Sequence, residues 1–284
     1  MITIKNEFLT ANFNELGAEI KSLISSENKE YIWNGDNKYW SLSSPILFPI
    51  CSGLKNDEYY YNGEKYTLYK HGFARGKVFE VEELKENKVT FLLRSDDETK
   101  KCYPFDFELR LVYELIGKTL RVTYLVKNLT DGEMYFSIGA HEGYDCPEGI
   151  EEYEVIFPQN ETLDAYELDG NALLDSKVRI IENSDRIALK YDYFVEDALV
   201  FKELKSKSMI LKNKADNKAV KLSFEGCDYF LIWTKVGAPY ICLEPWCGIT
   251  DSPDTDQNLK TKEGIIKLNK GEDFSNIHTI EILK

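Results

Sequence analysis

The sequence predicts an all-β protein built as a large antiparallel β-sandwich. Apolar and polar residues alternate in several segments, turns rich in Asn, Asp, Gly and Lys separate them, and helical periodicity is poor throughout. Because no regular helices intervene between the strands, the pattern disfavours a parallel α/β sheet. Large all-β units often reach the length of this chain, 284 residues, as one domain. With no repeat, low-complexity run or linker in the sequence, we expect a single domain over residues 1–284.

The clearest element is a hairpin within residues 107–126. Every second residue from Phe107 to Leu115 is apolar, which is typical of a half-buried strand. Gly117 and Lys118 supply a tight turn, and the alternation then resumes as far as Val126.

Weaker patterns predict the other elements. A second hairpin pairs residues 78–82 with 89–93 across the polar turn 85–88. Branched and aromatic residues predict further short strands at 134–138, 220–224, 229–233, 265–268 and 279–282. The best short helix candidates are 36–39 and 164–171.

Charge and hydropathy exclude several classes of partner. Asp and Glu outnumber Lys and Arg by 49 to 35, and the net charge of -14 repels nucleic acid and anionic membranes. No apolar stretch approaches the roughly 20 residues that span a bilayer. The N-terminal segment 1–7 alternates apolar and polar residues and lacks the apolar core of a secretion signal, so we expect a cytoplasmic protein.

The cysteines are expected to be reduced, because a cytoplasmic chain of this length neither needs nor easily keeps disulfides. Cys242 and Cys247 have no second pair of ligands nearby in the sequence, so their spacing gives a structural zinc site only weak support. Burial as small apolar residues explains the six cysteines better: Cys51, Cys102, Cys146, Cys227, Cys242 and Cys247.

Histidine is rare in this chain, with three in total, and two lie in glycine-bearing strings. His141 lies in residues 137–144, where flanking glycines let the chain turn sharply and admit a ligand. His71 lies in residues 71–75, close to Arg75. The alternatives are a hydrogen-bonded core histidine at 141 and a surface loop with an ordinary salt bridge at 71. His278 begins a predicted strand, and we assign it a structural or surface role.

Glu244 is the third candidate for proton chemistry. It precedes Pro245, which favours extended backbone and gives the side chain a defined direction, and Trp246 could shield one side. Burial would raise the pKa of this carboxyl toward neutrality. The alternative is a strand-end carboxylate paired with a lysine. Two imidazoles and one carboxylate together suggest paired proton transfer.

In their order along the chain, these strings resemble the aldose 1-epimerases, or galactose mutarotase-like proteins, and within them the bacterial LacX-like branch. The resemblance extends over nearly the whole chain and implies a β-supersandwich with a sugar cleft on one sheet face. It rests on residues 14–23, 44–49, 71–75, 139–141 and 243–246.

The resemblance also implies roles for individual residues. His141 resembles the general acid of the family, which a histidine partly protonated near neutrality would suit, and Glu244 resembles its general base. His71 resembles a histidine that helps to hold the sugar ring, and Asp197 an aspartate that binds a hydroxyl. Arg75 and Trp246 would be binding residues of the subgroup.

The implied reaction interconverts the α and β anomers of an aldohexose by opening and closing its ring. It needs no metal or organic cofactor, and we expect the protein to be a monomer or homodimer. The sequence departs from the galactose-specific branch after Glu244, where Pro245 and Trp246 replace a threonine or serine and a glutamine. It also offers Lys55 where that branch has an arginine, so a sugar phosphate bound by Lys55 and Arg75 is an alternative substrate. The rival classes are a sugar-binding module without turnover and a glycoside hydrolase with two catalytic carboxylates.

Overall fold

A computed structural model gives the fold for residues 1–216 and 218–283. The largest sheet has 14 strands, and its neighbouring strands run antiparallel. The all-β antiparallel class predicted from the sequence is therefore confirmed. In spatial order this sheet contains β6 (Glu80–Leu84), β7 (Lys88–Arg94), β8 (Phe107–Ile116), β9 (Thr119–Asn128), β21 (Asp273–Ile282), β17 (Ala219–Phe224), β16 (Ser208–Asn213), β13 (Tyr153–Asp169), β15 (Leu199–Phe201), β18 (Tyr229–Trp233), β19 (Tyr240–Cys247) and β11 (Ile138–Gly139), with β12 (Gly143–Asp145) on β19 and β14 (Ala172–Ala188) on β13.

Smaller elements complete the described part of the chain. A three-stranded sheet contains β1 (Ile2–Lys5), β2 (Leu9–Phe13) and β3 (Ile20–Ser25), and two strand pairs join β4 (Glu58–Tyr61) to β5 (Glu64–Thr67) and β10 (Met134–Phe136) to β20 (Ile266–Leu268). Within residues 1–216 and 218–283, helical structure is limited to α1 (Asp97–Cys102) and the short 3-10 turns η1 (Lys55–Asp57), η2 (Ala74–Gly76), η3 (Ile150–Glu152) and η4 (Tyr191–Phe194). No helix among the described residues is long and apolar enough to cross a bilayer.

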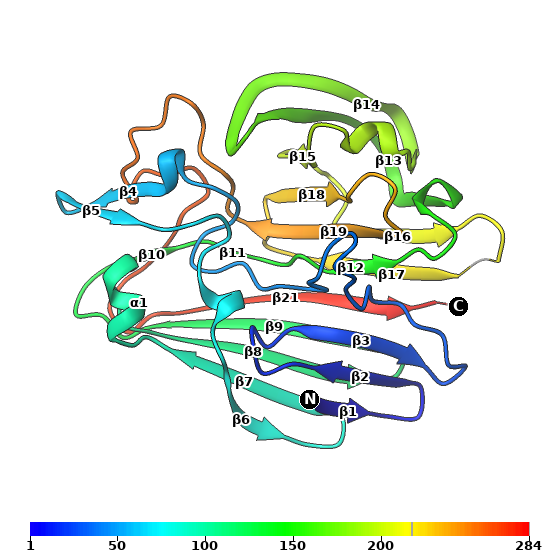
Figure 1. Ribbon diagram of the computed structural model, residues 1–284, viewed down its shortest axis with the longest axis horizontal. Helices are drawn as coiled ribbons and strands as arrows, with labels where there is room; N and C mark the ends of the chain where they lie inside the picture. Colours follow the sequence, from blue (N-terminus) through cyan, green and yellow to red (C-terminus); the bar gives the residue numbers. More distant parts are fainter. Residues whose placement is uncertain (217, 284) are drawn as a thin grey trace.

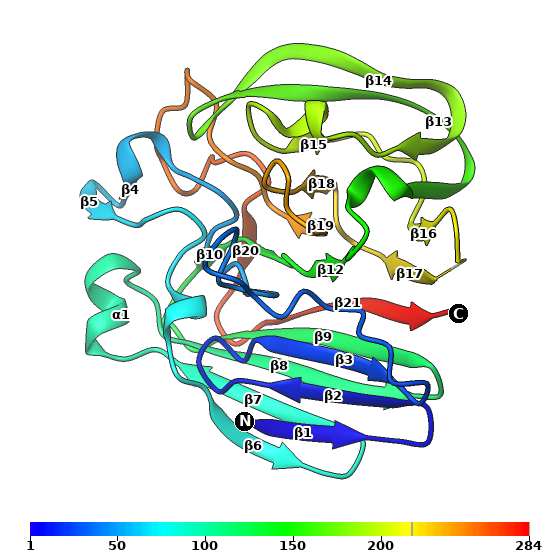
Figure 2. The ribbon, with the colours of Figure 1, turned by 45° about the vertical axis from the view of Figure 1, so that its right-hand side comes forward.

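The β1–β3 sheet covers one face of β7, β8 and β9 and makes the sandwich visible in Figures 1 and 2. Burial alternates along β8, because every second side chain from Phe107 to Leu115 is apolar and points to the covered face. Phe13 of β2 packs on Tyr113 of β8 with ring centroids 4.6 Å apart. The predicted hairpin is confirmed, with Ile116 paired to Thr119 around the turn.

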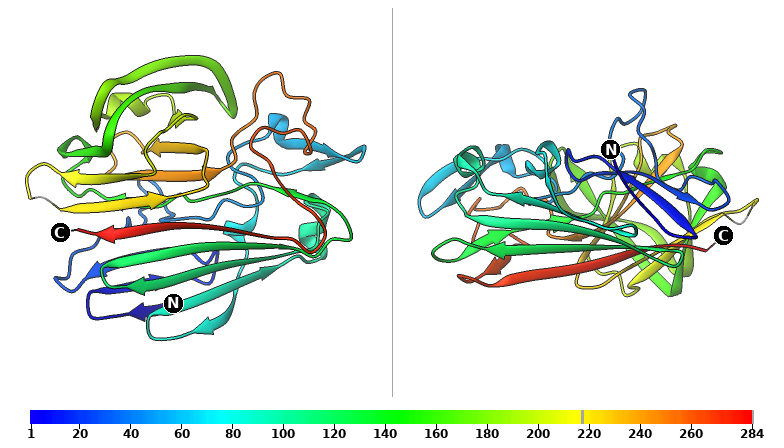
Figure 3. Two further views of the ribbon diagram at one scale, coloured as in Figure 1. Left: turned by 180° about the vertical axis from the view of Figure 1, so that it is seen from behind. Right: turned by 90° about the horizontal axis from the view of Figure 1, so that it is seen from below.

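The other half of the large sheet carries a long ribbon made by β13 and β14, which arches over β15 and β18 in Figure 1. Strand β21 lies between β9 and β17 and joins the two halves of the sheet, as the view from behind in Figure 3 shows. The ends of β11, β12, β15, β18 and β19 meet beneath the ribbon, and this region holds the candidate site.

The short strands predicted near the C-terminus and the hairpin of β6 and β7 are confirmed within one or two residues at most ends, although β21 extends well before 279.

Both helix predictions are wrong. Residues 36–39 form a turn closed by a hydrogen bond from Asp36 N to Trp40 O of 3.0 Å, and residues 164–169 belong to β13, where pairing with β14 overrides local preference. The helix α1 was not predicted, because the hydrophobic pattern does not indicate it. Its sequence signal is a capping box between Asp96 and Thr99.

Candidate active site

A cleft of about 370 Å³ opens on the sheet face beneath the β13–β14 ribbon. Apart from Lys55, every residue that the sequence singled out for binding or catalysis lines it. The cleft residues are Trp40, Ser52, Lys70, His71, Arg75, His141, Leu168, Asp197, Ala198, Leu231, Trp233, Glu244 and Trp246.

Strand register brings His141 and Glu244 together. Both β11 and β12 pair with β19, with Gly139 opposite Trp246 and Gly143 opposite Cys242, so the connection between them places His141 opposite Glu244. Directly opposed residues of antiparallel strands point to the same face. His141 Nδ1 lies 3.4 Å from Glu244 Oε1, and both side chains are buried.

Aromatic rings surround the imidazole of His141. Trp40 stacks on it with centroids 5.0 Å apart, and Trp233 meets it edge-on at 5.6 Å. Burial, followed by the positive charge of Arg75, lowers the pKa of His141 from 6.5 to about 3. This direction favours a neutral imidazole and runs against the expectation of a histidine that is partly protonated near neutrality.

The carboxyl of Glu244 is shifted in the opposite direction. Burial raises its pKa well above the usual value, and the negative charges of Glu142 and Asp197 add to this effect. These directions favour a neutral carboxyl beside the neutral imidazole of His141. His141 Nδ1 and Glu244 Oε2 are buried without a hydrogen-bond partner among the described residues, so both atoms are available to a ligand.

His71 lies beside His141, with ring centroids 5.5 Å apart, and forms a T-shaped contact with Trp246, with centroids 5.8 Å apart. Its Nδ1 accepts a hydrogen bond of 3.1 Å from Ser52 N. Burial and the nearby His141 lower the pKa of His71 well below 6.5, so the neutral ring carries its proton on Nε2. This tautomer makes Nε2 a hydrogen-bond donor.

The glycines in the two histidine strings are required by close backbone packing. Gly72 has a φ of +68°, and a Cβ added there would lie 2.3 Å from Phe48 O. A Cβ on Gly139 would lie 2.6 Å from the indole of Trp246. The indole of Trp246, a cleft residue, thus occupies the space beside Gly139. The glycine therefore allows Trp246 to line the cleft and does not itself leave room for a ligand.

Charged side chains line the rim of the cleft. Lys70 Nζ lies 3.8 Å from Asp197 Oδ2, and Arg75 donates a 3.0 Å hydrogen bond to Lys70 O. Asp197 precedes β15, and its Oδ1 accepts a hydrogen bond from Ala198 N. The cleft therefore presents both hydrogen-bond donors and acceptors, as recognition of hydroxyl groups requires.

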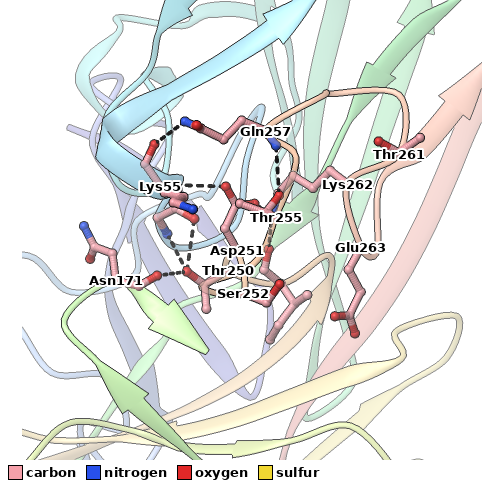
Figure 4. Close-up of polar contacts among 12 residues, drawn as sticks. Lys55, Asn171, Thr250, Asp251, Ser252, Thr255, Gln257, Thr261, Lys262 and Glu263 are labelled. Atoms are coloured by element: carbon pink, nitrogen blue, oxygen red, sulfur yellow. Dashed lines mark hydrogen bonds and ion pairs between the residues drawn. The ribbon is translucent and has the colours of Figure 1, made fainter. Parts of the chain in front are cut away.

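Lys55 does not reach this cleft. Its backbone N–H donates to Asp251 Oδ2 at 2.9 Å and its Nζ to Pro253 O at 2.7 Å, in a neighbouring pocket that also contains Asn171 and Ser252 (Figure 4). The loop around η1 places Lys55 against Asp251 and Pro253. The position of Lys55 in the sequence, upstream of His71, did not indicate these contacts.

Three prominent cleft residues were not picked out from the sequence: Trp40, Lys70 and Trp233. Lys70 directly precedes His71, so its place in the chain was a usable signal. For the two tryptophans the signal was weaker, namely the rarity of this residue type, with four in the chain.

Comparison with known proteins matches this geometry to one family. A family model described as aldose 1-epimerase matches residues 1–280. The chain belongs to the aldose 1-epimerase family. It is 34% identical over 281 residues to the plasmid-encoded protein LacX of Lactococcus lactis subsp. lactis, a match that covers 94% of each chain.

Solved structures of the aldose 1-epimerase family agree with the fold. A galactose mutarotase related enzyme from Lactobacillus acidophilus is 33% identical, with a TM-score of 0.94 over 100% of this chain and 97% of the other. A galactose mutarotase-like protein from Lactobacillus casei is 28% identical, with a TM-score of 0.92 over 99% of both chains. The resemblance seen in the sequence motifs is confirmed: the chain is an aldose 1-epimerase-like isomerase with a mutarotase function, and its substrate is a sugar.

Proposed function

We propose that the chain interconverts the α and β anomers of an unphosphorylated aldohexose, with His141 as general acid and Glu244 as general base. The observation that carries this assignment is the pair itself. Two groups able to exchange protons lie 3.4 Å apart, buried, on the wall of a cleft that fits a monosaccharide.

The reaction moves two protons and returns both. His141 gives a proton to the ring oxygen while Glu244 removes the proton of the anomeric hydroxyl, so the bond between the ring oxygen and the anomeric carbon breaks and a free aldehyde forms. The aldehyde rotates about its bond to the next carbon. When the ring closes on the opposite face, His141 recovers its proton and Glu244 returns the other.

Before the ring opens, His141 must be a protonated imidazolium and Glu244 an ionised carboxylate, so the proton that the two groups share must lie on His141. Burial alone favours that proton on Glu244 instead. Sugar hydroxyls that bond to the two unpartnered atoms would stabilise the ionised pair, and the proton then crosses from the carboxyl to the imidazole. The pair holds one proton in either arrangement, so this step needs no proton from solution.

The remaining cleft residues bind the sugar in this proposal. His71 donates from Nε2 and Asp197 accepts from a hydroxyl, while Arg75 and Trp246 contact the ring and its substituents. We leave Lys55 out, because its Nζ is bonded to Pro253 O. A sugar phosphate expected to need both Lys55 and Arg75 is accordingly the less favoured substrate.

We also propose that the protein acts in the cytoplasm as a monomer or homodimer.

Two-dimensional exchange NMR on glucose and galactose tests the proposed function. We expect the wild type to accelerate anomer exchange, and His141→Asn and Glu244→Gln each to reduce that acceleration by roughly 10²–10⁴-fold while circular dichroism stays unchanged. Full activity in either variant would contradict the residue assignment. Sugar binding without faster exchange would instead identify a binding module, and release of reducing sugar from a disaccharide would identify a glycoside hydrolase.

A further inference from the structure

A third side chain, Cys242, lies next to the His141 and Glu244 pair. Cys242 and Glu244 are two residues apart on β19, so both side chains point to the same face of the strand. His141 stands opposite Glu244 and diagonal to Cys242 in the register with β11 and β12. One nitrogen, one sulfur and one oxygen of these residues all lie within 4.8 Å of one another, and all three residues are buried.

These three atoms form a donor set that zinc prefers. Zinc binds histidine nitrogen and carboxylate oxygen at about 2.0–2.1 Å and cysteine sulfur at about 2.3 Å, usually in a tetrahedron. Those bond lengths place nitrogen and oxygen about 3.4 Å apart and sulfur about 3.6 Å from either. The Nδ1 to Oε1 distance of 3.4 Å already fits. Sulfur needs to approach by no more than about 1.2 Å from the 4.8 Å limit.

Two of the donor residues also lack partners. His141 Nδ1 and Glu244 Oε2 are buried polar atoms without a hydrogen bond among the described residues, and unpartnered buried atoms of this kind point to a missing ligand. Both side chains line the cleft. An ion held by the three residues would therefore keep its fourth position open to the cleft, as zinc sites with three protein ligands do.

We propose that His141, Cys242 and Glu244 form a Zn²⁺ site at the base of the cleft. Binding displaces the thiol proton of Cys242, and any proton held by Glu244, to the solvent. The ion occupies the two groups that the proposed isomerisation needs, so zinc is an inhibitor of the reaction and competes with the sugar. Only this competition rests on the proposed function; the zinc site itself does not.

Direct metal binding tests the site independently of activity. We expect chelator-treated wild type to bind one Co²⁺ per chain with a near-ultraviolet thiolate-to-cobalt charge-transfer band, and Zn²⁺ to displace it. Cys242→Ala should lose the band and bind Zn²⁺ at least about 100-fold more weakly, since even outer partners of a metal ligand are worth 10–100-fold in affinity. Cys146→Ser is the matched control, because Cys146 is an equally buried thiol outside the cluster.

The second measurement is zinc inhibition of anomer exchange. Zn²⁺ should inhibit the wild type and Cys146→Ser at the same concentrations and leave Cys242→Ala active. A wild type without the cobalt band, or a Cys242→Ala variant that keeps it, would overturn the proposal; Cys242→Ser replaces the alanine variant if the latter does not fold. A cobalt band in a protein that does not accelerate anomer exchange would refute the proposed function and leave the zinc site standing.

Discussion

His71 and His141 are buried, and burial lowers the pKa of both imidazoles below the ordinary value of about 6.5. An unfolded chain therefore takes up protons on these histidines at a higher pH than the folded chain does. Stability is fully present above pH 6.5 and falls as the pH drops from 6.5 toward the folded values. The raised pKa of Glu244 acts in the opposite sense, because its contribution is lost as the pH rises.

Replacing His71 by asparagine should therefore flatten the pH dependence of folding. Each buried histidine contributes at most about 1.4 kcal/mol per pH unit to the slope of the unfolding free energy below pH 6.5. Urea denaturation at pH 7, 6 and 5 in the presence of a chelator measures the slope for wild type and His71→Asn. The carboxyl groups contribute to both proteins and cancel in the comparison. Parallel slopes would show that His71 is protonated in the folded state as readily as in the unfolded one.

Glu142 and His278 form a second buried pair behind the cleft, with Oε1 and Nε2 2.8 Å apart. The charge of Glu142 helps to raise the pKa of Glu244. We predict that Glu142→Gln lowers the pKa of Glu244 and therefore moves the falling limb of the kcat/KM profile, where the pair loses its shared proton, to lower pH, while the amide oxygen still accepts from His278.

Anomer exchange measured from pH 4.5 to 8 gives the profile for Glu142→Gln. Glu151→Gln serves as the control, because it removes the same charge from an exposed position. Coincident profiles for the wild type and Glu142→Gln would exclude an influence of Glu142 on Glu244.

The candidate site could be read from the sequence only where its residues sit in recognisable strings. His71, His141 and Glu244 were found because a rare residue type, flanking glycines and a following proline mark them locally. The direction of the pKa shift of Glu244 was predicted from its expected burial, but the lowered pKa of His141 was not, since it depends on burial by Trp40 and Trp233 from distant segments. Lys55 was misplaced for the same reason, because its partners Asp251 and Pro253 lie far along the chain.

Among the elements, the long strands β8 and β9, which bury one face, were predicted, whereas the mostly exposed β14 was missed. The alternation in β8 and β9 is strict, and both strands were found. Most of β14 is exposed, and its pairing with β13 is interrupted by register shifts, so no period of two appears in its sequence. For this reason the hydrophobic pattern did not predict the β13–β14 ribbon that covers the cleft.

A buried ion pair ties the elements around the cleft to one another (Figure 4). Lys262 Nζ lies 2.7 Å from Asp251 Oδ1, and Asp251 also accepts from the backbone of Lys55 and, through its carbonyl, from Leu173 N in β14. Thr250 Oγ1 donates to Gly53 O, next to the residue that holds His71. The pair therefore connects η1 to the start of β14, and the neighbouring Thr250 connects the same segment to the loop that contains Ser52.

Lys262→Met should destabilise the protein by about 3–5 kcal/mol, because it leaves the carboxylate of Asp251 buried without its partner. Combining Lys262→Met with Asp251→Asn should recover part of that loss, since no buried charge then remains. Urea denaturation at pH 7 measures both effects. Lys270→Met, which breaks the exposed pair with Asp131, is the control and should change little. A Lys262→Met variant as stable as this control would show that the buried pair does not hold these elements.

Across the whole molecule, β21 connects the two halves of the large sheet. Ile280 is fully buried and pairs with Leu120 of β9 on one side and with Leu222 of β17 on the other. Apolar side chains from both halves pack in one continuous cluster that runs from Ile4 to Ile282. We propose on this basis that residues 1–284 fold as a single domain, as the sequence led us to expect.

If that is so, a cavity made in β21 should destabilise both halves together. Ile280→Ala removes a buried branched side chain and should reduce the unfolding free energy by about 2–5 kcal/mol. Calorimetry should show one transition at a lower Tm, with equal calorimetric and van't Hoff enthalpies. Ile277→Ala on the same strand is the control, because that side chain is 45% exposed and its loss should shift the Tm little. Two separate transitions, of which only one moves in Ile280→Ala, would show that the halves fold independently and that β21 does not couple them.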